Sequence, residues 1–237
     1  MARQKVDNFE ALRDMFTFSN NDEFYYVFVI KRLKDGDETE PYDNTLPEVF
    51  DNAIYYSGWT ITSYENLLEK KAEIVSLCEE KNARAYVTIN PRTFTETNIL
   101  AEELKSSWNV DGYEFMYAGI FGYLFNYYSN GRQTDERYYE WLNEKPRVLV
   151  DVDIDSKTGI GEIKEFLQNN GIATVTEANT PNGGIQFVCP NSDVKGLNFD
   201  YFDKYDRVGK LSMDAKYLGP AVHCLDDIAI NLYANLK

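Results

Sequence analysis

The chain is poor in the residues that build metal centres from sulfur and imidazole. Its 237 residues include three cysteines and one histidine. Cys78, Cys189 and Cys224 are far apart and form no Cys-x-x-Cys pair, which argues against a zinc site or a disulfide framework. We therefore expect reduced, partly buried cysteines in a cytoplasmic protein.

Long apolar runs are also lacking. No run approaches the length of about 20 residues that crosses a bilayer. The first seven residues turn polar at once and contain no apolar core of a signal peptide. The sequence thus predicts a protein without a membrane partner.

Positive charge is scarce. Lysine and arginine number 24 against 39 acidic residues, which gives a formal net charge of −15. A protein that holds a phosphate backbone by charge alone needs a basic surface, so this class is disfavoured. Metal ions can supply positive charge where phosphates bind, and an acidic protein can also bind a basic partner or imitate nucleic acid.

Aromatic residues are abundant, with 18 tyrosines and 14 phenylalanines, and favour a folded globular chain. Apolar spacing predicts the elements of the first part. They are a helix over 7–18, strands over 24–30, 59–62 and 83–90, a helix from 64 to 78 capped by Ser63, and helical structure over 93–128. The aromatic stripe of this last segment is more typical of a core than of a base-stacking platform.

Two arginines flank the strand expected over 83–90. Arg84 lies within the strand and Arg92 just beyond it. A guanidinium group in either place could bind a phosphate in a bidentate contact. Surface or structural ion pairing is the alternative for both.

The most informative stretch is 147–155, Arg-Val-Leu-Val-Asp-Val-Asp-Ile-Asp. Alternate residues of a strand share a face, so Asp151, Asp153 and Asp155 project from one side. Their repulsion is relieved if a hard divalent cation binds there. The structural alternative is a strand that runs out into an acidic loop, with Asp155 capping the next helix.

A helix over 161–169, strands over 172–176 and 184–189 and a polar linker over 177–182 follow the acidic strand. This order predicts a β-α-β-turn-β split unit whose first and last strands lie side by side. We expect a final helix within 221–236. The predicted class is α+β, with an RRM-like split β-α-β sheet in residues 146–237 packed with an N-terminal α/β portion, 1–145, in one compact domain.

Three motifs in residues 147–214 resemble the archaeo-eukaryotic primase superfamily, the primase–polymerases. Leu149 to Asp153 matches its apolar strand ending in Asp-x-Asp. Thr180-Pro181-Asn182-Gly183-Gly184-Ile185-Gln186 is similar to its glycine turn and following strand, and Leu211-Ser212-Met213-Asp214 to its later apolar-Asp motif. The whole chain also resembles small bacteriophage proteins, which would place it in the host cytoplasm.

The resemblance implies a set of site residues. Asp151, Asp153 and Asp214 would be catalytic and bind Mg²⁺ or Mn²⁺. The nucleotide would meet Thr180, Asn182, Gly183, Gly184 and Gln186, with Arg84 and Arg92 as further phosphate contacts. Backbone amides of glycines can approach a triphosphate closely.

One position departs from the family pattern. Gln186 stands where the family has histidine, and a neutral amide can bind a phosphate but carries no charge. His223, the only histidine, is remote in sequence and is not expected in register to replace it.

The leading hypothesis is a metal-dependent nucleotide-binding protein and nucleotidyltransferase of the DNA primase–polymerase type. Its expected partners are a nucleoside triphosphate and a DNA template. The first alternative is a catalytically inactive phage accessory protein of the same fold, which binds a nucleotide or a host or phage protein. A metal-dependent nuclease using the same carboxylates is the second, although no lysine or histidine is expected near them.

Overall fold

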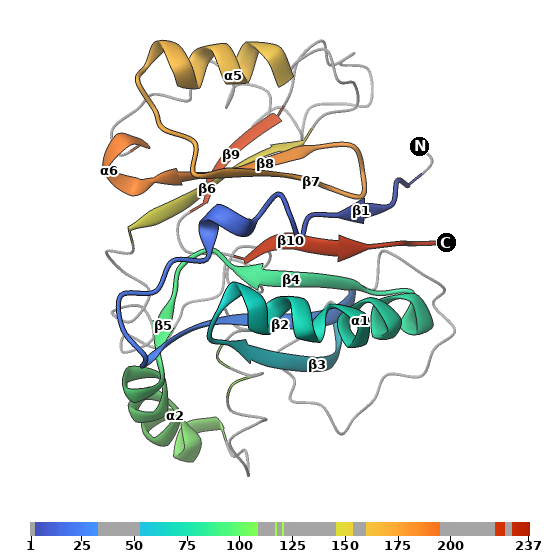
Figure 1. Ribbon diagram of the computed structural model, residues 1–237, viewed down its shortest axis with the longest axis vertical. Helices are drawn as coiled ribbons and strands as arrows, with labels where there is room; N and C mark the ends of the chain where they lie inside the picture. Colours follow the sequence, from blue (N-terminus) through green and yellow to red (C-terminus); the bar gives the residue numbers. More distant parts are fainter. Residues whose placement is uncertain are drawn as a thin grey trace.

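The computed structural model describes residues 3–32, 53–108, 117, 120, 146–153, 160–194, 221–225 and 229–237. For Asp151, Asp153 and residues 221–225 it describes the backbone. Within these ranges no helix combines the length and apolar character required to cross a bilayer. The fold is α+β, as predicted, with two antiparallel sheets and helices packed on them (Figure 1).

The elements alternate along the chain. The strands are β1 (Val6–Asp7), β2 (Glu23–Arg32), β3 (Ala53–Ile61), β4 (Arg84–Thr88), β5 (Arg92–Thr93), β6 (Arg147–Asp153), β7 (Thr176–Asn179), β8 (Ile185–Pro190), β9 (Ala221–Leu225) and β10 (Ala229–Ala234). The helices are η1 (Arg13–Met15), α1 (Tyr64–Lys81), α2 (Phe94–Trp108), α5 (Ile160–Asn169) and α6 (Asn191–Val194).

The large sheet has the strand order β1-β10-β4-β2-β3, and β5 pairs with β2. Its centre is apolar because β2 and β4 are rich in aromatic and β-branched residues, which suit a buried pleated surface. Val27 lies opposite Val87, and Val87 lies opposite Ile230 on β10. All three are fully buried and belong to the main core.

Helix α1 covers one face of the large sheet (Figure 1). It begins as predicted, with Ser63 Oγ accepting a hydrogen bond from Asn66 N at 3.0 Å. It ends at Asn82, whose left-handed φ of 50° is typical of a helix C-terminus. Its buried face includes Cys78, where burial and then Glu79 raise the pKa of the thiol to about 12.

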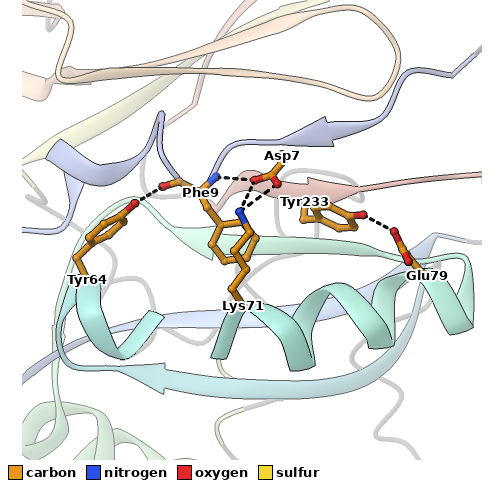
Figure 2. Close-up of polar contacts among 6 residues, drawn as sticks. All are labelled: Asp7, Phe9, Tyr64, Lys71, Glu79 and Tyr233. Carbon is orange, nitrogen blue, oxygen red and sulfur yellow. Dashed lines mark hydrogen bonds and ion pairs between the residues drawn. The ribbon is translucent and has the colours of Figure 1, made fainter. Parts of the chain in front are cut away.

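Polar contacts fasten the terminal strands to α1 (Figure 2). Lys71 Nζ lies 3.1 Å from Asp7 Oδ1 on β1, and the Tyr64 hydroxyl donates to Phe9 O at 3.2 Å. Tyr233 on β10 donates to Glu79 Oε1 at 2.6 Å. Helix α1 therefore makes polar contacts with β1, with the segment that follows it and with β10.

The small sheet has the order β7-β8-β6-β9. Strands β6 and β8 lie side by side with α5 between them in sequence, which confirms the split unit. Its description as RRM-like stays a prediction. Strand β7 begins at residue 176, whereas we expected a strand over 172–176. Ile172 instead closes the turn that terminates α5, because its N–H bonds to Leu167 O while Gly171 takes a φ of 70°.

Two further expectations are wrong. The segment 7–18 contains one short 3₁₀ turn, Arg13–Met15, and is otherwise irregular. Its apolar side chains nevertheless belong to the main core. The expected final helix is replaced by β9 and β10. The six residues of β10 are all buried and five of them pair with β4, so the tail returns to the N-terminal sheet across the expected boundary at residue 146.

Candidate functional site at the join of the two sheets

The acidic strand β6 has two different faces. Val188 on the neighbouring strand β8 and Ala178 on β7, the next strand beyond it, belong to the main core together with Leu149 of β6. Phe187 precedes Val188 on β8, so its side chain lies on the opposite face of the small sheet. There Lys164 Nζ of α5 is 5.9 Å from the centre of the Phe187 ring. Since alternate residues share a face, Asp151 and Asp153 lie on the Leu149 face, which is turned toward the large sheet.

A single row of residues crosses both sheets on this face. Asp151 lies between Gln186 on β8 and His223 on β9 in the antiparallel register. Gln186 in turn contacts Asn231 on β10, and Asn231 lies opposite Tyr86 on β4. The carboxylate strand is therefore linked to the centre of the large sheet.

The contact between Gln186 and Asn231 fixes the orientation of the glutamine amide. Gln186 Oε1 accepts hydrogen bonds from Asn231 N at 3.1 Å and from Asn231 Nδ2 at 2.9 Å. A backbone N–H can only donate, so the atom facing it must be the oxygen. Gln186 Nε2 is thus a donor that the contact with Asn231 does not use, whereas Oε1 is fully used.

Arg147 anchors the start of β6. Its guanidinium donates to Met15 O at 2.7 Å, to the Tyr25 hydroxyl at 2.9 Å, to Ile89 O at 3.1 Å and to Thr17 Oγ1 at 2.8 Å. The backbone of Arg147 also exchanges two hydrogen bonds with the Asn90 side chain. Nη1, which carries two N–H groups, makes three of these contacts, and Nη2 makes the fourth, to Thr17.

The N-terminal segment bridges the two sheets beside the row. Asn8 Nδ2 donates to Asn179 O at 3.0 Å and to Asn231 O at 2.8 Å. Thr176 also donates its hydroxyl to Ala11 O. Asn8 itself is 2 % exposed, so this bridge is part of the interior.

The predicted glycine turn connects β7 to β8. Thr180 and Gly184 close it through an N–H to carbonyl bond of 2.9 Å, and Gly183 has a φ of 92°, which L side chains disfavour. Asn182 is exposed at the tip of the turn. Gln4 donates a hydrogen bond from its side-chain amide to Thr180 O and one from its backbone N–H to Pro181 O. Val152 is paired with Ile185, so the register brings the end of β6 beside this turn.

Arg84 and Arg92 lie on the large sheet and are 2 % and 1 % exposed. Arg84 is two residues from Tyr86 on β4 and so shares its face, where Tyr86 stacks on Phe28 with ring centres 5.8 Å apart. Arg92 lies opposite Phe24, at the other end of β2. The structure thus brings Arg84 near the row and places Arg92 away from it.

The aromatic stripe packs as a core where it is described, because Tyr117 stacks on Phe24 at 5.7 Å. Asp155 and Asp214 lie outside the described residues. Among the side chains that the structure describes, no three His, Cys, Asp or Glu residues are grouped to hold a metal ion. The carboxylates of Asp151 and Asp153 are not among those side chains.

His223 was not expected in register to replace the histidine missing at position 186, and its backbone lies on the other side of Asp151 from Gln186. It lies directly opposite Asp151, in the same row as Gln186. The expectation of a final helix within 221–236 gave no indication of this pairing between β9 and β6. Asn8 and Asn231 were also missed, since their importance depends on contacts across 171 and 45 residues of sequence. Comparison with family models, curated proteins and solved structures finds no match to this chain.

Proposed function

We propose that the protein binds a nucleoside triphosphate through Mg²⁺ or Mn²⁺ at the end of β6 and transfers its nucleotidyl group. The observation that carries the proposal is the register of β6, which sets Asp151 between two polar residues, Gln186 and His223. Carboxylates one pleat apart, Asp151 and Asp153, form an oxygen donor set that suits hard cations. Asp214 is a candidate third ligand by the resemblance alone.

The neighbouring groups suit a triphosphate. Gln186 Nε2 is a neutral donor that can bind a phosphate oxygen, and Gly183 allows the backbone of the turn to approach a ligand closely. Thr180, Asn182 and Gly184 belong to the same turn, and Arg84 shares a sheet face with the row. These features support a phosphate-facing role for the turn.

In the proposed reaction a 3′-hydroxyl attacks the α-phosphorus, the bond between the α and β phosphates breaks, and pyrophosphate leaves. Bound divalent cations would activate the hydroxyl and stabilise the leaving group. Asp151 and Asp153 would hold those cations, while Gln186 and the turn would orient the triphosphate.

The alternative is an accessory protein of the same fold that binds a nucleotide or a host or phage protein without chemistry. The use of Gln186 Oε1 in a structural contact with Asn231 favours it. A protein partner would suit the acidic surface of the chain, whose formal charge is −15.

The test compares Asp151→Asn with Glu165→Gln, an exposed residue of α5 whose loss removes the same charge away from the join. We expect Mn²⁺ and a nucleoside triphosphate together to raise the melting temperature of the wild type and of Glu165→Gln. A ligand at about 100 times its Kd adds about 2.7 kcal/mol. Asp151→Asn should lose this gain.

Extension of a primed template then separates the two candidates. Incorporation by the wild type, lost in Asp151→Asn, supports the transferase, whereas binding without incorporation supports the accessory protein. An unchanged wild-type melting temperature with metal and nucleotide would overturn nucleotide binding altogether.

A further inference from the structure

We propose that the outer edge of β3 is an interaction surface through which two copies of this chain pair, strand against strand, into a two-fold dimer. Strand β3 lies at one edge of the large sheet and is the longest of the strands that end either sheet (Figure 1). Among the described residues it pairs with β2 alone. The inference does not depend on the proposed function, whose residues lie at the join of the two sheets.

The register of β2 shows which backbone groups of β3 face outward. Tyr26 N donates to a threonine hydroxyl on β4, so the N–H and C=O groups of Tyr26 are turned away from β3. Those of the next residue, Val27, therefore face β3, where Trp59 lies opposite. The peptide groups of Trp59 are thus bonded to β2, and those of Gly58 and Thr60 point to the outer edge.

The outward groups can be reached by a second strand. Every residue from 55 to 60 is partly exposed. Gly58 and Thr60 make no hydrogen bond at this edge to any residue that the structure describes. A row of unpaired N–H and C=O groups at a sheet edge is a template for pairing with another strand.

Two other edge strands carry the usual protections against such pairing. Strand β1 has two residues, and one of them, Asp7, forms an ion pair with Lys71. Strand β7 carries the charged Glu177, and the Asn8 side chain binds both backbone groups of Asn179. Strand β3 has nine residues and contains neither a charged residue nor a proline.

A bulge limits the pairing surface at one end. Ser57 and Tyr55 lie opposite consecutive residues of β2, so Tyr56 is an extra residue in β3. The five residues after the bulge, 57–61, are in regular register with β2. This length is typical of a strand in a globular protein.

The segment 57–61 is complementary to itself. In an antiparallel pair centred on Trp59, Gly58 of each copy exchanges two hydrogen bonds with Thr60 of the other. Trp59 then lies opposite Trp59 of the second copy at a non-hydrogen-bonded position, where side chains are close and aromatic pairs stabilise a sheet. The indole of Trp59 packs against the main core and keeps a partly exposed surface for this contact.

The charge of the chain favours contact between copies at this strand. Each chain has a formal net charge of −15, so two copies repel each other. Because β3 contains no charged residue, the register centred on Trp59 places no carboxylate opposite another. Salt screens the remaining repulsion, so the dimer should become tighter as ionic strength rises.

The experiment uses the full-length, untagged chain. Sedimentation equilibrium over a range of protein and salt concentrations should show a monomer–dimer equilibrium that shifts toward the dimer with both. Residue-resolved amide hydrogen exchange then locates the contact. The amides of Gly58 and Thr60 should exchange more slowly as the dimer forms, whereas those of Ser57, Trp59 and Ile61, already bonded to β2, should change little. This alternation needs no substitution.

A pair of variants tests the edge itself. Thr60→Pro removes the outward N–H of residue 60 and leaves the ladder with β2 in place, since proline is tolerated where an edge N–H faces solvent. Half of the hydrogen bonds between the copies are lost, so the Kd of the dimer should rise about 10-fold or more. Thr60→Val keeps the N–H and the side-chain shape, and should dimerise like the wild type.

Several results would overturn the inference. One is a wild-type chain that stays monomeric at every concentration. Another is a dimer in which Gly58 and Thr60 keep the exchange rates of the monomer, or whose Kd Thr60→Pro leaves unchanged. A dimer that salt weakens would show a contact made by ion pairs at another surface.

Discussion

The two layers that pack against the large sheet are held in different ways. Helix α1 packs through apolar side chains, among them Leu67, Ile74 and Cys78, which are fully buried. Its polar contacts, such as Lys71 with Asp7, lie at the rim (Figure 2). The small sheet adds to its apolar contacts a set of side-chain hydrogen bonds that cross the join, from Arg147 at one end to Asn8 at the other.

This difference has a physical consequence. Apolar burial is non-directional and stabilises any arrangement that removes the same surface from water. Hydrogen bonds require a donor and an acceptor at one distance and angle, so they fix which residues lie opposite each other. The join therefore fixes β6, and with it Asp151 and Asp153, relative to the large sheet.

The strongest way to break the join is Arg147→Met, which keeps the length of the side chain and removes its donors. Several buried carbonyl and hydroxyl groups would lose a charged partner, and each unsatisfied group costs about 1–3 kcal/mol. We expect a loss of about 3 kcal/mol or more in the free energy of unfolding, measured by urea denaturation.

Lys164→Met is the matched control, because Lys164 makes an exposed ion pair with Glu177 at 2.7 Å. Such pairs contribute about 0–1 kcal/mol. If Arg147→Met cost no more than Lys164→Met, the join would be held by its apolar contacts instead.

A smaller effect is expected at the centre of the join. Gln186→Leu removes the acceptor for Asn231 N and Nδ2. We expect a cost of about 1–3 kcal/mol, because Asn231 is buried and its donors would lack a partner.

A double-mutant cycle with Asn231→Val isolates the side-chain part of this contact, because valine keeps the backbone N–H of residue 231. The coupling energy between the two substitutions should be about 1–3 kcal/mol, as for neighbours in one hydrogen-bond network. Additive effects would show that Gln186 and Asn231 do not stabilise each other, and the row would lose its link to the large sheet.

Local signals in the sequence predicted the elements built from neighbouring residues. Ser63 and the apolar spacing after it gave the start of α1, and the β-branched runs gave β2 and β4. The pleat of β6 placed Asp151 and Asp153 on one face from the alternation of residue types alone. The same short-range order predicted the adjacency of β6 and β8.

Long-range pairing was not accessible in this way. Strand β10 joins β4 across more than half of the chain, and no local pattern specifies that partner. Reading the tail as helix hid the position of His223, although Val222 and Cys224 around it are compatible with a strand. The metal-binding and nucleotide-binding roles of the named residues stay predictions, since they depend on carboxylates beyond the described side chains.

The smallest effect concerns the contact between Tyr233 on β10 and Glu79 on α1. The protonation of these two groups should change the stability of the protein with pH. Burial, followed by the hydrogen bond to Glu79, raises the pKa of the Tyr233 hydroxyl, and the same bond lowers the pKa of Glu79. Above pH 10 the unfolded chain loses the tyrosine proton first, so stability falls as pH rises. Below pH 4.5 the unfolded chain binds the glutamate proton first, so stability falls as pH drops.

Tyr233→Phe should flatten both limbs of the curve of unfolding free energy against pH. Tyr64→Phe is the control: burial, more than the nearby Glu10, raises the pKa of Tyr64, so this variant should flatten the alkaline limb alone. Cys78, whose thiol has a pKa raised from 9.0 to about 12, keeps some alkaline dependence in both variants. An acid limb unchanged by Tyr233→Phe would show that Glu79 draws its stabilisation from Asn235 and the nearby lysines instead.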